Sequence, residues 1–391
     1  MSTGTAATVR PTDLAEARAA VLDTAGPLLF TGGGTKLDWG VPPEGIEVIV
    51  ETSAMADVLA HDAADATVAV QAGTRLADLQ RTLAEDDQWL AINPPLVDRG
   101  ATVGGILASG DAGPQRVAHG TMRDLVIGAT YVLADGAVGR TGGFVIKNVA
   151  GYDMAKLLCG SLGTLALVAE VVLRVNPRPQ ASATLRVAAD AATAARLAAT
   201  VATAPVEPSA FEWAGDAAWI RFSGHDDAVH AQIERTAALL GDRRGDADEV
   251  TGDDETTAWR GLTEDLAGTD GETVVRGGCL PSHLTDAARS CAIAADAAGV
   301  DVVLQATVPL GVLTARVRGG DAAGHAAFVD AWRGRLAARG GHAVVRRTAP
   351  GVAETVDVWG PPPSAISLMR RVKDQLDPDG RCAPGRFVGG I

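Results

Sequence analysis

Glycine is concentrated in one part of this 391-residue chain. Thirteen glycines lie within residues 101–170, whereas the longer stretch 181–275 contains eight. Glycine opens backbone conformations that other residues avoid and lets another group approach the main chain closely. A dense glycine block among apolar residues therefore indicates a backbone packed tightly against itself or against a ligand.

The first 95 residues alternate between the periods of strands and helices. Strands are predicted at Ile46–Glu51, Thr67–Ala72 and Trp89–Ile92, where apolar and β-branched residues cluster. Helices are predicted from Ser53 to about Asp62 and over Arg75–Glu85, whose leucines share one face. This β-α-β-α-β order predicts a layered α/β or α+β structure.

A change in composition after Pro177–Pro179 marks a domain boundary. Beyond it, predicted strands alternate with predicted helices in an alanine-rich region: strands at 183–188, 211–213 and 218–222, helices at 191–203 and 227–240. The charged run 242–254 is predicted to be a solvated loop. The pattern as a whole predicts an antiparallel sheet with helices on one face.

Charge and cysteine content argue against several function classes. Asp and Glu number 48 against 34 Lys and Arg, and the net charge of −14 disfavours nucleic acid or an anionic membrane as a partner. The four cysteines are far apart and form no CxxC pair, so neither a zinc ribbon nor an iron–sulfur cluster is expected within this chain. No apolar run approaches 18 residues and no secretory signal opens the chain, so we expect a cytoplasmic protein.

Three segments carry the glycines that bear on chemistry. Residues 31–40 read TGGGTKLDWG, a turn able to point backbone N–H groups at an anion. Residues 93–124 place small side chains around Gly104 and Gly105, where a flat ring or a pyrophosphate could lie on the main chain. Residues 142–170 set polar side chains among further glycines. Taken singly, the first segment is also compatible with a plain tight turn, and the second with a glycine-rich connection in a β domain. Neither a P-loop nor a GxGxxG fingerprint occurs.

Together these segments resemble the FAD-binding domain of the vanillyl-alcohol-oxidase and p-cresol-methylhydroxylase (PCMH) family, and within it the glycolate-oxidase type. The resemblance rests on GGGTKLDWG, ATVGG, KNVAGYD and GSLGTL, which occur in this order over about residues 28–180. The segment LDPDGRCAPGRF at 376–387 resembles the DPxGxxNPGR that closes members of the family. Residues 181–350 show little that can be matched.

The resemblance implies FAD contacts from three parts of the chain. The first loop is expected to hold the pyrophosphate through Gly32, Gly33, Gly34, Thr35 and Lys36. The second segment is expected to run past the pyrophosphate and the isoalloxazine through Thr102, Gly104, Gly105, Ser109, Asp111, Gly113, Gly120 and Asp124. The third is expected to contribute Asn148, Gly151, Tyr152 and Asp153 near the flavin, with Gly163 and Val168 on the adenine and ribose side.

The chain departs from the family pattern at three positions. His119 stands where many relatives have Tyr, Ala166 replaces a common Gly, and Ala383 replaces the Asn of NPGR. Alanine cannot make the side-chain hydrogen bond that an asparagine could make there. TGGGTK also offers no histidine for covalent attachment of a flavin, so we expect noncovalent FAD.

The resemblance implies an α+β fold: a two-subdomain PCMH-type FAD-binding domain and an α+β cap domain. We expect the FAD-binding domain at residues 1–180 and the cap, on the substrate side, at residues 181–350. Residues 351–391 are expected to form a C-terminal tail that returns to the FAD-binding domain.

The resemblance further implies an FAD-linked oxidoreductase, a glycolate-oxidase-type subunit that oxidises a small 2-hydroxy acid (glycolate to glyoxylate) and passes electrons to a partner. The implied partners are a catalytic flavoprotein subunit and an iron–sulfur subunit, which could hold the chain at the inner face of the membrane. Three alternatives stay open: a non-catalytic FAD-binding structural or electron-relay subunit, a stand-alone oxidase of another alcohol or sugar acid, and an interaction protein that has lost FAD.

Catalytic residues cannot be assigned from the sequence. Oxidation of a 2-hydroxy acid needs a cation to hold the carboxylate and a base to take the hydroxyl proton. The candidates for the cation are Arg276, Arg316 and Arg346, although an arginine in such a context is more often a surface residue. His342 is a weak candidate for the base. His225 and His230 are five residues apart, which suits neither a helical nor a strand metal motif, so no metal site is expected.

Overall fold

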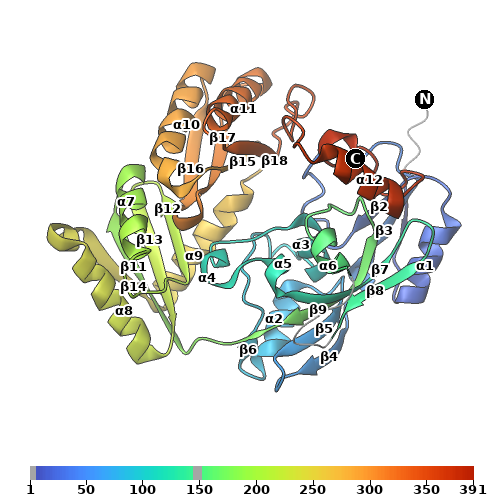
Figure 1. The fold of residues 1–391 in the computed structure, drawn as a ribbon, viewed down its shortest axis with the longest axis horizontal. Coiled ribbons are helices and arrows are strands. Elements are labelled where there is room, and N and C mark those ends of the chain that lie inside the picture. Colours follow the sequence, from blue (N-terminus) through green and yellow to red (C-terminus); the bar gives the residue numbers. More distant parts are fainter. Residues whose placement is uncertain (1–5, 144–151) are drawn as a thin grey trace. The chain divides into compact units, whose positions relative to one another are not determined.

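The computed structural model describes residues 6–143 and 152–391 (Figure 1). The chain divides into two compact units, each discontinuous in sequence. Unit 1 consists of Met1–Ala112, Gly120–Arg178 and Pro361–Ile391, and unit 2 of Gly113–His119 and Pro179–Gly360. The C-terminal segment thus belongs with the first part of the chain, while residues 113–119 leave unit 1 to join unit 2.

Unit 1 contains two main sheets. A parallel sheet has the order β1-β3-β2, and an antiparallel sheet has the order β4-β5-β9-β7-β8. The strands are Ala7–Val9 (β1), Leu28–Thr31 (β2), Val48–Glu51 (β3), Val58–Asp62 (β4), Thr67–Gln71 (β5), Val126–Val132 (β7), Val138–Gly142 (β8) and Leu167–Arg174 (β9). A further short pair joins Gln88–Trp89 (β6) to Asn176–Pro177 (β10).

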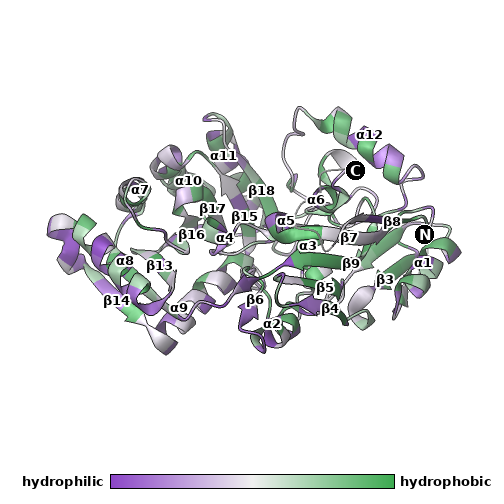
Figure 2. Ribbon diagram, turned by 60° about the horizontal axis from the view of Figure 1, so that its bottom comes forward, coloured by the Kyte–Doolittle hydropathy of each residue, from purple (hydrophilic) through white to green (hydrophobic). Residues whose placement is uncertain are grey.

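Short helices accompany these sheets. The described ones are Leu14–Asp23 (α1), Leu76–Ala84 (α2), Val103–Ser109 (α3), Met122–Leu125 (α5), Met154–Leu158 (α6) and Ile366–Leu376 (α12). Leu76, Leu79 and Leu83 of α2 are all buried, as their spacing predicts. They join residues of α3, β5 and β9 in one apolar core, and Figure 2 shows α3 and β9 as predominantly hydrophobic.

The segment predicted as a helix from Ser53 to Asp62 has a different structure. Thr52–Ala54 forms a single 3₁₀ turn, and β4 follows it. The Ser53 hydroxyl donates to Glu51 Oε1 at 2.5 Å and does not cap a helix. β4 pairs with β5, whose residues are all buried, so sheet pairing outweighs the helix propensity of the alanines. The helix prediction was wrong for this reason.

Unit 2 is built on one eight-stranded antiparallel sheet with the order β14-β11-β13-β12-β16-β17-β15-β18. Its strands are Ala181–Ala188 (β11), Ala210–Ala214 (β12), Ala217–Gly224 (β13), Ala247–Thr251 (β14), Thr273–Gly278 (β15), Asp301–Thr307 (β16), Val312–Arg318 (β17) and His342–Arg347 (β18). The described helices are Arg116–His119 (α4), Ala191–Val201 (α7), Asp226–Leu239 (α8), Gly252–Glu264 (α9), Leu284–Ala298 (α10) and Ala322–Ala337 (α11).

The two faces of this sheet differ in chemistry. One face buries Phe211, Ile220 and Phe222 in an apolar core together with residues of α7, α8, α10 and α11. Side chains alternate between faces along a strand, so Glu212 lies on the opposite face. Trp259 of α9 packs against Ala210, which shares that opposite face. The prediction of an antiparallel sheet is correct, but α9 shows that the helices are not confined to one face.

The charged run 242–254 was predicted as a loop and contains regular structure. β14 pairs with β11 at the edge of the sheet, with Asp248 and Glu249 exposed. Charged side chains on an edge strand oppose pairing with another chain. The acidic residues Asp253 and Asp254 then stand in the first turn of α9, where they interact favourably with the helix dipole. The loop prediction was wrong because the charges of this run have two structural causes. Some lie on an edge strand, and others lie in the first turn of a helix.

Candidate functional site

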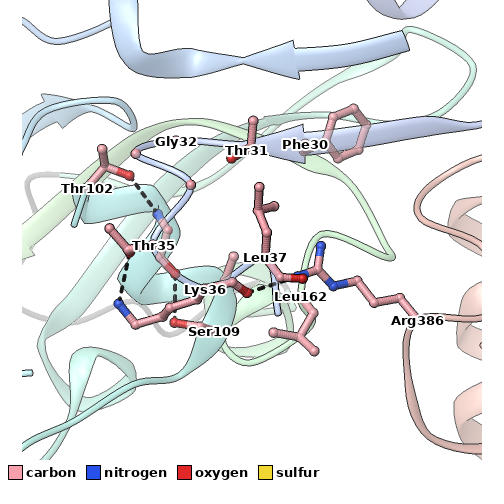
Figure 3. Close-up of a pocket in the computed structure, with 14 residues that line it drawn as sticks. Phe30, Thr31, Gly32, Thr35, Lys36, Leu37, Thr102, Ser109, Leu162 and Arg386 are labelled. Carbon is pink, nitrogen blue, oxygen red and sulfur yellow. Dashed lines mark hydrogen bonds between the residues drawn. The ribbon is translucent and has the colours of Figure 1, made fainter. Parts of the chain in front are cut away.

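The glycine loop after β2 lines a pocket in unit 1 (Figure 3). Eight of the predicted residues line this pocket: Gly32, Gly33, Gly34, Thr35, Lys36, Thr102, Gly105 and Ser109. Phe30, Leu37, Leu162 and Arg386 are among the other residues around it. The structure therefore brings the first two predicted segments together, although about 70 positions separate them in sequence.

Glycine is required in this loop because the backbone passes close to its neighbours. A Cβ built on Gly32 would lie 2.1 Å from Thr102 Oγ1, and one built on Gly33 would lie 2.0 Å from the carbonyl oxygen of Gly100. Within the described part of the chain, the amides of residues 32–35 donate to no backbone carbonyl. Several amide donors are therefore available to one anion, which fits the pyrophosphate that the resemblance places here.

Lys36 and Asp111 form a buried ion pair beside the loop. Lys36 Nζ lies 3.4 Å from Asp111 Oδ2, and both side chains are less than a tenth exposed. Asp111 Oδ2 accepts no hydrogen bond among the described residues, while Oδ1 accepts from the amide of Ala112 at 3.0 Å. The ammonium is thus held in place by charge at a distance longer than a good hydrogen bond, and it keeps donor capacity for a bound anion.

Arg386 holds the loop from the C-terminal tail. Its Nη2 donates to the carbonyl oxygens of Lys36 at 3.1 Å and Leu37 at 3.3 Å, and its Nε donates to the carbonyl of Trp39 at 3.3 Å. Burial lowers the pKa of the Arg386 guanidinium. In Figure 3 Lys36 and Arg386 extend on opposite sides of the loop. Arg386 was not among the predicted site residues, although the closing motif that contains it was recognised.

Two further side chains anchor the tail within unit 1. Lys373 Nζ donates to Asp377 Oδ2 at 2.6 Å and to the carbonyls of Thr164 at 2.7 Å and Cys382 at 2.9 Å. The guanidinium of Arg381 donates to several backbone carbonyls, with that of Ala134 at 2.6 Å. The tail is therefore fastened by buried charged groups whose hydrogen bonds are made, the arrangement that burial of charge demands.

The structure explains why asparagine is suitable at the position of Ala383. Ala383 has a φ of +43°, in the left-handed region, where asparagine and glycine are favoured over alanine. The residue is fully buried and donates its N–H to the carbonyl of Leu28 at 2.8 Å. The backbone conformation and this hydrogen bond thus need no asparagine side chain, and alanine keeps both at the cost of some backbone strain.

Other predicted site residues stabilise the local backbone of unit 1. The Gly104 N–H donates to the carbonyl of Ala72 at 2.8 Å, and a Cβ on Gly104 would lie 2.6 Å from that of Ala72. Asp124 accepts from the N–H of Thr121 at 2.8 Å and the hydroxyl at 2.9 Å, which lowers the pKa of its carboxyl. A Cβ on Gly120 would lie 2.6 Å from Asp124 Oδ2. These three residues fix the backbone locally, and none of them is among the residues that line the pocket.

The remaining predicted residues are spread more widely. Gly163 has a φ of +76° in a turn, Val168 is buried in the apolar core of β9, and Gly113 belongs to unit 2. Tyr152 is 91% exposed, and Asp153 caps α6 by accepting from the N–H of Lys156. Asn148 and Gly151 lie outside the described residues. The pocket therefore includes part of the predicted set only.

Unit 2 carries charged groups on the sheet face opposite its core. Arg276 pairs across β15 and β17 with Thr314, which pairs with Gln305, so the three share this face. Arg316 lies 3.0 Å from Asp265 and 3.7 Å from Glu272, so two carboxylates already hold it. Among the predicted cations, Arg276 has no such carboxylate within 4 Å in the described chain.

Glu212 is a fully buried carboxyl group on that same face. Its oxygens accept from the Thr307 hydroxyl at 2.5 Å and the Gln305 amide at 3.0 Å. Burial raises the pKa of Glu212 to about 7, and the nearby charges of Arg276 and Arg116 oppose that rise. Nothing in the sequence singled it out, because burial of one glutamate is a property of the assembled sheet.

Glu212→Gln is expected to change the pH dependence of stability. The folded carboxyl has a pKa of about 7, against about 4.3 when unfolded, so between these values the folded chain holds the extra proton. Stability from this group is present below about pH 4 and is lost as pH rises to 7. Urea unfolding followed by tryptophan fluorescence should show the variant gaining about 2–3 kcal/mol on the native chain between pH 5 and pH 8. A pH-independent difference would contradict the buried, proton-holding carboxyl.

The described residues contain neither a metal-holding cluster nor a membrane-spanning helix. Within residues 6–143 and 152–391, no three His, Cys, Asp or Glu side chains gather in a way that could hold a metal ion. No helix in the same part of the chain is long and apolar enough to span a bilayer.

Comparison with known proteins connects the glycine loop with a family. Residues 5–153 match the family described as an FAD binding domain. Glycolate oxidase subunit GlcE of Escherichia coli is 34% identical over 208 residues, which is 53% of this chain and 59% of that protein. Glycolate oxidase subunit GlcD of Bacillus subtilis is 33% identical over 159 residues, 41% of this chain and 34% of that protein. The chain thus spans less than two thirds of either relative.

A solved structure of an alkyldihydroxyacetonephosphate synthase has the same fold. It aligns with 97% of this chain and 77% of its own length, with a TM-score of 0.72 and 18% identity. At that identity the likeness concerns the fold alone. It confirms, together with the domain match, the predicted α+β class and its PCMH-type FAD-binding domain.

Proposed function

We propose that this chain, which carries an FAD binding domain in residues 5–153, is an FAD-dependent oxidoreductase of small 2-hydroxy acids. The observation that supports the proposal most is the loop after β2. In it the amides of residues 32–35 are open to an anion, and Arg386 holds the carbonyls of Lys36 and Leu37. Backbone donors bind a pyrophosphate without any excess of basic residues, so an acidic chain can hold a dianion.

The roles of the protein groups follow from their positions. The amides of residues 32–35 and the Lys36 ammonium would hold the pyrophosphate, and Asp111 would fix the ammonium through its ion pair. Bound FAD supplies the chemistry of accepting a hydride equivalent from the substrate carbon. We expect the FAD to be bound noncovalently, because the loop TGGGTK offers no histidine for covalent attachment.

Arg276 is our choice for the group that binds the substrate carboxylate. A guanidinium matches a carboxylate with two parallel hydrogen bonds. Arg316 is already held by Asp265 and Glu272, which makes it the poorer choice. Arg276 also shares its sheet face with Gln305 and Thr314, whose polar groups could orient a hydroxy acid.

Glycolate is the proposed substrate, and an assembly with a catalytic flavoprotein and an iron–sulfur subunit is the proposed setting. The similarity to two glycolate oxidase subunits supports both parts of the proposal. A second function is an FAD-binding structural or electron-relay subunit without turnover of its own. The lack of a metal-holding cluster among the described residues is consistent with that reading.

An anaerobic reduction screen tests the proposal. The purified chain is expected to show flavin absorbance, and mild acid should release FAD into the supernatant. Glycolate, D-lactate and related acids are then added without oxygen. Bleaching of the flavin by glycolate, with Arg276→Met raising the concentration needed at least about tenfold, would support substrate oxidation by this chain. If the chain binds FAD but none of the hydroxy acids bleaches it, the result would support an FAD-binding structural or electron-relay subunit. A chain that never binds FAD would contradict both proposed functions.

A further inference from the structure

A groove in unit 2 plays no part in the function proposed above. It is bounded by α10, by α11 and by the residues that lead from β15 into α10, and its cavity measures about 320 Å³. That volume lies near the lower end of the range for small-ligand pockets, about 300–1,000 Å³. Ala287 and Leu336 give the groove a buried apolar lining, and Ile293 adds a partly exposed one. α10 and α11 pack side by side (Figure 1).

The groove gathers positive charge in a chain whose net charge is −14. Arg289, Arg335 and Arg339 line it together with one carboxylate, that of Asp286. Asp286 already pairs with Arg339 at 2.7 Å and with Arg289 at 3.6 Å. Three guanidinium groups against one carboxylate leave a formal charge of +2. Arg335 has no carboxylate within 4 Å among the described residues, so its hydrogen-bonding fork is open to a ligand.

Two neighbouring side chains complete the lining of the groove. His283 lines the groove, and its Nδ1 is buried without a hydrogen-bond partner in the described part of the chain. Burial also raises the pKa of the Cys279 thiol, which keeps it neutral and adds no negative charge to the groove.

We propose that this groove binds a small organic dianion. Two negative charges balance the formal charge of +2, and the planar forks of Arg335 and Arg339 match carboxylate or phosphate oxygens. The carbon body of the ligand would rest on Ala287, Leu336 and Ile293. The groove lies on the helix side of the sheet, opposite the face of Arg276 and Glu212, so it is separate from the proposed substrate contacts.

Isothermal titration calorimetry of the full chain loaded with FAD tests this proposal. The ligands are succinate, inorganic phosphate and, as a monoanion, acetate. One dianion is expected to bind per chain, with acetate at least about tenfold weaker. Arg335→Met should raise the Kd of the dianion at least about tenfold. Arg235→Met is the matched control, because Arg235 is an exposed arginine of α8 outside the groove, and its Kd should not change.

The outcomes distinguish a dicarboxylate ligand from a phosphate ligand. Binding of succinate alone indicates a dicarboxylate ligand, and binding of phosphate alone a phosphate compound; either supports the proposal. No binding of either dianion, equal binding of acetate, or an unchanged Kd in Arg335→Met would overturn it. As a second readout, NMR of isotope-labelled histidine side chains should show the resonances of His283 shifting with the dianion in the native chain, and shifting in Arg335→Met only at dianion concentrations at least about tenfold higher.

Discussion

Gly105→Asp is expected to abolish FAD binding while the chain stays folded. Gly105 lines the pocket, and the nearest atom that a Cβ would meet is Thr102 Oγ1, at 3.0 Å. The new carboxylate would therefore enter the pocket at small steric cost and face the negative charge of the pyrophosphate. Like charges brought together cost several kcal/mol, so the affinity for FAD should fall at least about a hundredfold. The flavin-to-protein absorbance ratio after purification measures the effect.

Gly105→Asn is the control, because asparagine has the shape of aspartate without its charge. It should retain much more flavin than Gly105→Asp. Equal loss in both variants would mean that space, and not charge, decides binding. Full flavin content in Gly105→Asp would refute the assignment of this pocket to the pyrophosphate. Gly33→Asp is a poorer test, since any Cβ there would clash with the carbonyl of Gly100.

Lys373→Met is expected to destabilise unit 1 by about 3–5 kcal/mol. The substitution leaves Asp377 buried with no cation, and the carbonyls of Thr164 and Cys382 lose their donor. Removing one partner of a buried pair costs more than the pair itself contributes, because the remaining charge stays desolvated. The midpoint of urea unfolding, followed by far-ultraviolet circular dichroism, gives the size of the change.

Asp374→Asn is the matched control on the same helix, because Asp374 is exposed and should shift the midpoint by no more than about 0.5 kcal/mol. Flavin content should fall in Lys373→Met together with stability, since the tail also carries Arg386 to the loop. A midpoint equal to that of the native chain would show that Lys373 is solvated, and that the tail is held by other contacts.

Local patterns predicted much of unit 1. The strand at Ile46–Glu51 and the helix at Arg75–Glu85 are confirmed within two residues as β3 and α2, because each carries the apolar period of its structure. Of the strand at Trp89–Ile92, only the first residue is in a strand, β6. The failures have a common cause. β4 and β14 are both set by the strand each pairs with. β4 pairs with β5, the next strand along the chain, and this pairing outweighs the helix propensity of its alanines. β14 pairs with β11, about 60 positions earlier, and so distant a partner leaves no local pattern.

The candidate site also contains residues that could be predicted from the sequence and residues that could not. The glycines of the loop could be predicted because close backbone approach demands that residue type. The role of Arg386 could not, because its partners are the carbonyls of Lys36 and Leu37, and backbone carbonyls carry no sequence signal. The buried charge of Glu212 was missed because its burial depends on strands β12 and β16 lying side by side.

The contacts of the C-terminal tail also determine when, during synthesis of the chain, the glycine loop can be completed. Arg386 reaches Lys36 across 350 positions, and Cys382 bridges to Leu28 over a similar span. Residues 179–360 of unit 2 are translated in between. A chain still on the ribosome therefore presents the glycine loop without its arginine until residue 386 has emerged from the exit tunnel. Contacts between residues so distant in sequence also form slowly. A flavin held by this loop together with Arg386 would therefore be bound only after residues 179–360 of unit 2 have been translated.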